Sequence, residues 1–296
     1  MDVIKTLSHK WFIPGVFILL WSGGAIFVEL GLAYAEPLPF LTLRFLIATV
    51  LMWGFCLVEH PSSPTGLSEW GIVVLTAVFQ QIGYQFFYFL ALDHDISPGV
   101  LTIILGAQPV LTAVLMREGT SRFQWLGLAF GMIGLICVVG RQMFSGSLSL
   151  SGILYSLLSL LSITIGTMTQ KSVRVSLLAN VTIQYTCSFI IFTVLSLSFG
   201  SLTVQWTGLF LLSLLYMALG VTAGATMLFY HLISKGNLTN TTSIFYCVPP
   251  VTAIMDYFVF GHVLYLTTLI GMILIVAGMA LINKRDKVHA ERTEKV

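Results

Sequence analysis

The chain has 296 residues, of which 57% are hydrophobic and 9% are charged, and its mean hydropathy is +0.95. Because soluble domains carry about 25% charged residues, this composition excludes a water-soluble globule. The 14 Lys and Arg against 12 Asp and Glu leave no basic surplus for a nucleic-acid groove. The four cysteines lie in apolar runs, which excludes a secreted disulfide scaffold. The composition indicates an integral membrane protein.

Ten apolar runs qualify as membrane-spanning helices, which need about 20 residues each. They lie near residues 12–32, 38–58, 70–90, 98–116, 123–140, 151–170, 179–199, 207–231, 238–260 and 264–283. The runs are continuously apolar rather than alternating, which excludes transmembrane β-strands. We therefore expect an all-α membrane protein with ten transmembrane helices.

The positive charges predict the orientation of these helices. With ten spans both termini lie on one side, and that side holds twelve of the Lys and Arg residues. Arg141 lies on the opposite side and Arg44 lies within a span, which accounts for all 14. Because cytoplasmic loops carry the excess of positive charge, we expect both termini in the cytoplasm.

The two halves of the chain resemble each other. At an offset of 140 residues, Phe40–Phe45 aligns with Asn180–Tyr185, and Pro109–Ala113 aligns with Pro249–Ala253. Five helices per half is an odd number, so the second copy must enter the membrane upside down relative to the first. Inverted repeats of this kind are typical of secondary transporters, which hold substrate near the midplane. We therefore predict two repeats, residues 1–141 and 142–296, around a central cavity.

Two motifs carry a resemblance to a known family. The run from Tyr246 to Ala253 followed by Phe260-Gly261 resembles the ninth-helix signature of the EamA family of the drug/metabolite transporter superfamily. Gly106–Ala113 resembles the fourth-helix counterpart, and Arg44 falls where the second helix of that family often has Arg. The resemblance implies a ten-helix permease of the bacterial inner membrane, with a cavity lined mainly by helices 1, 3, 4, 6, 8 and 9. It also implies export of amino acids, related metabolites or toxic compounds. The chain departs from the family in having His262 where members often have Glu, and Asp256 where a small residue is common.

Three charged residues lie within predicted spans: Glu29, Arg44 and Asp256. Each charge at a helix centre costs about 2.5–3.5 kcal/mol to insert, so these residues are candidates for function. Their similar predicted depth makes a Glu29–Arg44 or an Arg44–Asp256 pair feasible. They are interpreted either as an external gate or proton-coupling site, or as a structural ion pair or side chains that extend to the interface.

The third span carries the clearest polar face. Gln80, Tyr84 and Tyr88 follow a four-residue spacing, and Gln81 with Gln85 forms the adjacent stripe. Amides that faced lipid would be costly, so this face is expected to point inward. It could line a wet cavity or form a hydrogen-bonded seam between helices, and we favour the cavity.

Matching prolines mark the fourth and ninth spans. Proline frees the carbonyl one turn back, which in a membrane is tolerated only against protein, water or substrate. Pro109, Pro249 and Pro250 are therefore candidate hinges, with ordinary packing kinks as the alternative. The polar or aromatic residues near these prolines, and one on the first span, are added to the cavity candidates: Gln108, Asn240, Ser243, Tyr246 and Trp21.

Other sites are absent from the sequence or weakly indicated. The histidines are scattered, no Cys-x-x-Cys or Walker lysine motif occurs, and we expect no metal, no cofactor and no enzymatic activity. Gly127-x-x-x-Gly131 is a close-packing motif that would also allow a homodimer contact.

The sequence therefore favours a secondary-active or exchange transporter that exports small metabolites by alternating access. Its expected partners are the small-molecule substrate, membrane lipid and either a proton or a counter-substrate, with no nucleic acid. The absence of a deep cation other than Arg44 argues against strongly anionic cargo. The alternatives are a lipid or lipid-carrier translocase on the same fold and a non-transporting receptor or assembly protein. Substrate identity, direction and coupling cannot be read from these residues.

Overall fold

A computed structural model describes residues 2–94, 96, 98–116, 121–139, 149–199, 203–261 and 265–283. The side chains of residues 2–11, 25, 92, 93, 98, 99, 139, 256, 260 and 283 are not part of this description. The described chain is helical, and its helices divide into two compact units. The first unit comprises Met1–Phe89 and Leu161–Lys235, and the second comprises Leu90–Leu160 and Gly236–Val296. Each unit therefore combines helices from both halves of the sequence.

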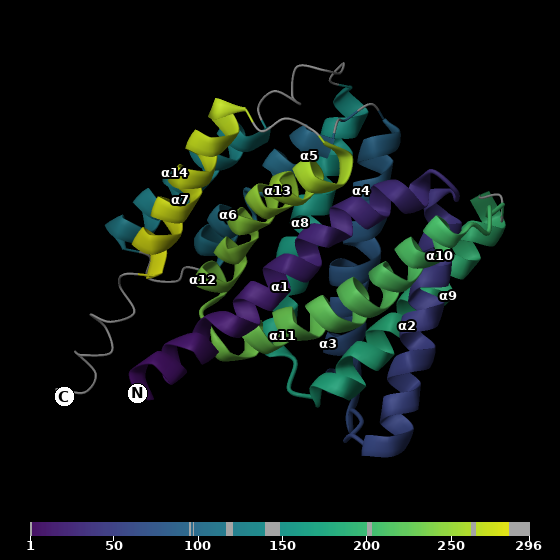
Figure 1. The fold of residues 1–296 in the computed structure, drawn as a ribbon. Helices are drawn as coiled ribbons and strands as arrows, with labels where there is room; N and C mark the ends of the chain where they lie inside the picture. Colours follow the sequence, from purple (N-terminus) through teal and green to yellow (C-terminus); the bar gives the residue numbers. More distant parts are fainter. Residues whose placement is uncertain are drawn as a thin grey trace, which may run out of the picture. The chain divides into compact units, whose positions relative to one another are not determined.

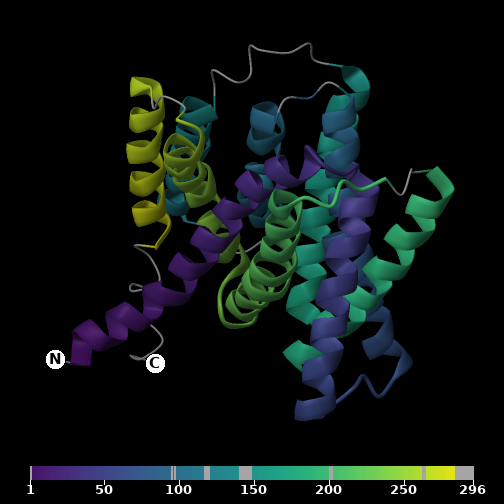
Figure 2. The same ribbon diagram turned by 45° about the vertical axis from the view of Figure 1, so that its right-hand side comes forward.

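The first unit contains the first, second, third, seventh and eighth spans and the end of the sixth. Its elements are α1 (Asp2–Leu32), α2 (Pro37–Glu59), α3 (Leu67–Thr76), η1 (Ala77–Gly83), most of α4 (Tyr84–Asp93), the second half of α8 (Leu150–Ser172), α9 (Leu177–Phe199), α10 (Gly208–Leu215), η3 (Tyr216–Ala225) and α11 (Thr226–Lys235). The long helices α2 and α9 lie side by side (Figures 1 and 2). Because α2 and α9 are the second helix of each repeat, the two repeats meet inside this unit.

The second unit contains the fourth, fifth, ninth and tenth spans. Its elements are the end of α4, the first half of α8, α5 (Pro98–Leu105), α6 (Gln108–Leu115), α7 (Arg122–Val139), α12 (Leu238–Ser243), η4 (Ile244–Cys247), α13 (Val248–Phe260) and α14 (Leu266–Asn283). Here α7 packs along α14, which is the fifth helix of the other repeat (Figure 1).

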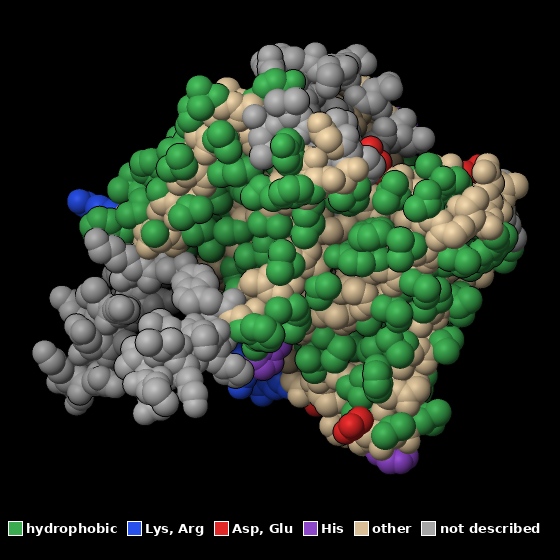
Figure 3. All heavy atoms as spheres, viewed as in Figure 1, with side chains coloured by type: hydrophobic (Ala, Val, Ile, Leu, Met, Phe, Trp, Pro, Cys, Tyr) green, Lys and Arg blue, Asp and Glu red, His purple; other side chains and the backbone are tan. Residues whose placement is uncertain are grey.

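The ten predicted spans are confirmed within a few residues at each end. Seven helices are long and apolar enough to cross a membrane, and three shorter apolar helices (Val100–Leu115, Arg122–Val138 and Leu266–Ile282) bring the described total to ten. Figure 3 shows that hydrophobic side chains cover most of the visible face, with few charged ones. The chain is thus an all-α, multi-pass membrane protein.

Local sequence signals explain where several helices begin and end. Pro37 opens α2, where its missing N–H costs nothing. Ser121 and Gln124 form a reciprocal capping box at α7: Gln124 N donates to Ser121 Oγ, and Ser121 N donates to Gln124 Oε1. Gly261 ends α13 in the left-handed region with φ of 74°, which glycine adopts without strain.

The fourth and ninth spans are interrupted directly before their prolines. Helix α5 ends at Leu105, and α6 starts at Gln108 with Pro109 in its first turn. In the ninth span, the 3₁₀ turn η4 precedes α13, whose first turn holds Pro249 and Pro250. Proline cannot donate the hydrogen bond that would continue the preceding helix, so the break falls one turn earlier. The breaks agree with the prediction, whereas the hinge role of these prolines stays a prediction.

Glycines bring α7 and α14 into backbone contact. A Cβ on Gly134 would lie 2.7 Å from the carbonyl oxygen of Gly271, and one on Gly127 would lie 2.6 Å from that of Gly278. A Cβ on Gly131 would meet the Tyr246 ring at 2.6 Å. The predicted close packing therefore occurs within the chain, and a homodimer stays a prediction that other surfaces would have to support.

The third and eighth spans share an irregularity at mid-length. Residues 77–83 and 216–225 form π-helices between α-helical segments, and the two lie about 140 residues apart in the sequence. Thr222 Oγ1 donates to Met217 O at 2.8 Å and Thr226 Oγ1 donates to Val221 O at 3.3 Å, so threonine hydroxyls satisfy carbonyls five residues back. π-Helical turns occur frequently at functional sites.

Candidate functional site

The polar face predicted on the third span is divided between two environments. Gln80 and Gln81 are 4% and 5% exposed. Gln80 Oε1 accepts a hydrogen bond from Thr167 Oγ1 at 3.3 Å, and Gln81 Nε2 donates to the Tyr230 hydroxyl at 2.9 Å. These two amides therefore lie in seams between helices. Three residues that follow on α4, Tyr84, Gln85 and Tyr88, are only half-buried.

A buried amide network extends from Gln81 through three further helices. The Tyr230 hydroxyl, which accepts from Gln81, donates to Gln184 Oε1 at 2.6 Å. Gln184 Nε2 donates to Asn180 Oδ1 at 2.8 Å and to Gln170 Oε1 at 3.0 Å, and Asn180 Nδ2 donates to the same Gln170 oxygen at 3.1 Å. Five side chains from η1, α11, α9 and α8 thus satisfy one another, which is the condition for keeping polar groups inside a membrane.

Close approach of the backbones makes this packing feasible. A Cβ on Gly166 of α8 would lie 2.6 Å from the backbone nitrogen of Gln80, so only glycine lets α8 approach η1 this closely. On the other repeat, a Cβ on Gly24 of α1 would contact Val221 of η3 at 3.1 Å. Both π-helices are therefore packed against a small residue of a neighbouring helix.

Arg44 lies in a different environment. Its side chain is 5% exposed, and its Nε donates to Thr222 Oγ1 in η3. Its guanidinium carbon lies 5.6 Å from the centre of the Phe45 ring, and Tyr84 and Tyr185 are its electrostatic neighbours. The Tyr185 hydroxyl in turn donates to the Thr222 carbonyl. The Glu29 side chain is exposed, and the hydrogen bond of Arg44 among the described residues goes to Thr222 rather than to Glu29.

Arg44 and Gln184 occupy equivalent positions in the two halves, 140 residues apart. Each contacts the π-helical span of the opposite half: Arg44 bonds Thr222, and Gln184 reaches Gln81 through Tyr230. Thr222 and Gln81 both lie 14 residues after the start of their spans at Gly208 and Leu67. The two contacts are therefore related by the repeat, although their chemistry differs.

Aromatic groups lie near Arg44: Phe45 and Tyr185 are fully buried, and Tyr84 is half-buried. The rings of Tyr84 and Tyr88 lie edge to face with centroids 6.0 Å apart, and Phe45 packs between Tyr185 and Phe192 at 5.8 and 5.6 Å. Trp21 belongs to a separate aromatic cluster on α1 and α11, 5.4 Å from the Phe17 ring and 6.5 Å from the Phe229 ring.

The remaining candidates lie in the second unit. Asn240 Oδ1 accepts from Gln124 Nε2 at 3.3 Å, and Ser243 Oγ donates to Asn240 O at 2.7 Å. Gln108 is 2% exposed at the start of α6. Tyr246 is 1% exposed, and its hydroxyl finds no partner in the described part of the chain. The Asp256 side chain lies outside the described residues, so its predicted pairing stays a prediction.

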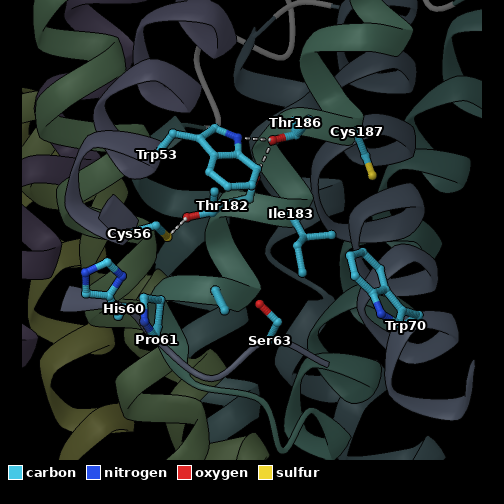
Figure 4. Close-up of a pocket in the computed structure, with 11 residues that line it drawn as sticks. Trp53, Cys56, His60, Pro61, Ser63, Trp70, Thr182, Ile183, Thr186 and Cys187 are labelled. Carbon is cyan, nitrogen blue, oxygen red and sulfur yellow. Dashed lines mark hydrogen bonds between the residues drawn. The ribbon is translucent and has the colours of Figure 1, made fainter. Parts of the chain in front are cut away.

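A lateral groove of about 420 Å³ opens on the first unit (Figure 4). It lies between α2, α3, α9 and the segment that joins α2 to α3. Trp53 Nε1 donates to Thr186 Oγ1 at 3.1 Å, and Cys56 Sγ lies 3.2 Å from Thr182 Oγ1. No sequence-predicted site residue and no Lys or Arg lines it among the described residues. The groove therefore lies apart from the Arg44 cluster and the amide network.

Several residues of these clusters were not singled out as site residues by the sequence. Tyr230 and Tyr185 carry no motif, and their partners lie on other helices. Gln184 and Asn180 could have been found from the repeat, because Gln184 is opposite Arg44 at the same offset. No group of three or more His, Cys, Asp or Glu side chains gathers into a metal site within the described ranges.

Comparison with known proteins identifies the relatives of this chain. The profile of the EamA-like transporter family matches twice, at residues 12–140 and 150–284. The chain is 27% identical to the "Uncharacterized transporter YvbV" of Bacillus subtilis, over 91% of this chain and 90% of that protein. It is 23% identical to a Salmonella typhimurium protein named "Probable amino-acid metabolite efflux pump", over 90% of this chain and 92% of that one.

A solved crystal structure shares the fold. It superposes with a TM-score of 0.80, covering 97% of this chain and 99% of the other, at 19% sequence identity. At that identity the likeness concerns the fold alone.

Proposed function

Because the chain belongs to the EamA-like transporter family and is thus a multi-pass membrane transporter rather than an enzyme, we propose that it is a secondary carrier that exports small metabolites. It works by alternating access in the bacterial inner membrane, with both termini in the cytoplasm. The name of the Salmonella typhimurium relative supports amino acids or related compounds as the substrate class. Energy comes from a proton gradient or from exchange with a counter-substrate.

The observation that carries this proposal is the unequal pair of contacts at Arg44 and Gln184. Inverted repeats give a carrier two mirror-related states, and each repeat adopts in one state the conformation of the other in the second state. In one such state, we expect the two repeat-related contacts to differ in strength. The amide network around Gln184 would hold one side closed, while the contact at Arg44 remains incomplete.

The candidate residues then take three roles. The substrate-binding or cavity residues are Trp21, Gln80, Gln81, Tyr84, Gln85, Tyr88, Gln108, Asn240, Ser243 and Tyr246. Glu29, Arg44 and Asp256 serve as gate or coupling residues. Pro109, Pro249 and Pro250 serve as hinges, and the two repeats (residues 1–141 and 142–296) move against each other.

Counterflow with purified protein in liposomes tests the proposal directly. Vesicles preloaded with unlabelled amino acids, nucleosides or cationic drugs should accumulate the matching labelled compound without any imposed gradient. Empty liposomes and vesicles loaded with an unrelated sugar serve as controls. If no compound exchanges although the protein is folded and inserted, the carrier function is wrong.

Cysteine labelling tests the chamber itself. The four native cysteines are first replaced, and single cysteines are placed at positions 81, 85 and 108. A small hydrophilic thiol reagent should modify at least one position from one side, and substrate should change that reactivity. If none reacts from either side under any condition, no water-filled chamber exists at these residues.

A separate experiment assigns the coupling. Glu29→Gln and Asp256→Asn are made singly, and flux is measured with and without a pH gradient. Loss of the gradient's effect in one variant, with counterflow retained, assigns proton coupling to that carboxylate. An unchanged gradient response in both eliminates these two residues.

A further inference from the structure

Arg44 is a buried cation without a counter-ion in the described structure. It interacts there with neutral groups, the Thr222 hydroxyl and the Phe45 ring, and Tyr84 and Tyr185 are its electrostatic neighbours. The Tyr185 hydroxyl is already committed to the Thr222 carbonyl. No carboxylate whose side chain is described pairs with this guanidinium. Charged residues within membrane spans normally pair with one another or face a water-filled cavity, since burial without a partner is costly.

The geometry leaves one edge of the guanidinium available. The single hydrogen bond of Arg44 is made by Nε, so the two terminal nitrogens donate to no described residue. Those two nitrogens present parallel N–H groups that match the two oxygens of a carboxylate. Thr222 fixes the Nε edge, because its hydroxyl accepts from Arg44 while donating to Met217 O at 2.8 Å. The guanidinium group of Arg44 is therefore held in one orientation before a ligand binds.

The surroundings suit an apolar body attached to that carboxylate. Tyr84, an electrostatic neighbour of Arg44, stands edge to face with Tyr88, and both residues are half-buried. Aromatic rings with a few placed polar groups are typical of sites for small organic ligands.

We infer that Arg44 binds the carboxylate of a substrate that carries one such group and an apolar or aromatic body, such as a neutral amino acid. This inference rests on the proposed carrier function and narrows its substrate class. It also fits the absence of a second deep cation, because one fork neutralises one carboxylate. Thr222 is the positioning residue, and Tyr84 and Tyr88 contact the apolar body.

Matched ligands test the inference by binding, independently of transport. The purified full chain is titrated with six neutral amino acids of increasing side-chain size and with their carboxamides, which keep the body and lose the charge. At least one amino acid should bind, and its amide should bind about ten- to a hundredfold more weakly. Arg44→Gln should remove this preference, Arg44→Lys should keep part of it, and Arg174→Gln, at an exposed cation outside the spans, should leave it unchanged.

The outcomes separate this inference from the proposed function. Equal binding of amino acid and amide, or no binding by any of the six amino acids, overturns the carboxylate site even if counterflow of other compounds succeeds. Carboxylate-selective binding without counterflow supports the site and overturns the carrier function. Asp256 is tested as an internal partner: if Arg44→Gln and Asp256→Asn each lower the melting temperature and the double variant restores it, Arg44 is paired within the chain and the inference is overturned. Retained melting temperature in Arg44→Gln shows that lost binding is not unfolding.

Discussion

Arg44 and Gln184 stand at equivalent positions in the two repeats. Both are buried polar side chains in a membrane span, and the surrounding protein satisfies their hydrogen-bonding groups in different ways. Gln184 is neutral, and its amide is satisfied by Tyr230, Asn180 and Gln170. Arg44 carries a charge, and the described protein gives it one hydrogen bond, to Thr222, and the face of the Phe45 ring. The repeat conserves the position of a buried polar contact between the second helix of one half and the π-helical span of the other. It does not conserve how completely that contact is satisfied.

The largest effect is expected when the two positions are made alike. Gln184→Arg places a second cation where amides already occupy the available space. Inserting an arginine at a helix centre costs about 2.5–3.5 kcal/mol, and here it also disrupts the network. We expect loss of monodisperse protein on size-exclusion chromatography. The control is Gln205→Arg, at an exposed residue outside the spans. Wild-type yield of the Gln184 variant would mean that this position accommodates a cation as readily as the Arg44 position does.

Removing the bridging hydroxyl should produce the next largest effect. Tyr230→Phe deletes one donor and one acceptor and leaves Gln81 and Gln184 partly unpaired. Because an orphaned buried polar group costs about 1–3 kcal/mol, the melting temperature in detergent should fall by several degrees. Tyr257→Phe, at a 46% exposed side chain, is the matched control. An unchanged melting temperature would show that the network contributes little to the stability of the folded protein.

The acceptor of Arg44 should matter less for stability and more for ligand binding. Thr222→Val removes the hydroxyl that orients the guanidinium, whereas Thr222→Ser keeps it. We expect the free energy of unfolding to fall by about 1–2 kcal/mol in Thr222→Val, since hydrogen bonds to charged groups contribute more stability than neutral ones. Thermal unfolding and amino-acid titration of both variants measure this. Equal behaviour of valine and serine would contradict the positioning role.

The smallest effect is expected at an exposed contact between α2 and α9. Trp53→Phe removes the hydrogen bond to Thr186, which borders the lateral groove (Figure 4). Trp53 is 50% exposed, and interhelical hydrogen bonds in membranes average about 0.6 kcal/mol. The melting temperature should therefore stay close to that of the control Trp206→Phe. A shift as large as that of Tyr230→Phe would show that this exposed hydrogen bond contributes as much to stability as the buried network does.

Much of the fold followed from local patterns. The ten spans and the close packing of Gly127 and Gly131 were predicted and are present, and the helix breaks lie at the prolines that were marked as hinges or kinks. Each depends on chain-local physics: a bilayer demands long apolar helices, proline lacks a donor, and glycine lacks a Cβ. The π-helical segments were not predicted, because no residue pattern distinguishes them from ordinary α-helix.

The candidate site was predicted only in part. The polar face of the third span was recognised, but its division between the hydrogen-bonded Gln80 and Gln81 and the half-buried Tyr84 was not. That division depends on Tyr230 and Thr167, which approach from helices distant in the sequence. The partner of Arg44 was sought among carboxylates, whereas the structure pairs it with Thr222.

The sequence by itself determined that the chain crosses a membrane in two related halves, because apolar length, charge placement and the 140-residue offset are properties of the linear chain. Only the tertiary structure decided which repeat-related polar residues are satisfied, since hydrogen bonds between helices depend on rotation and approach of whole helices. In the first unit, Gly166 lets α8 approach η1, where the amide network forms. Thr222 accepts the hydrogen bond from Arg44 Nε, and the two terminal nitrogens of Arg44 keep unused donors among the described residues.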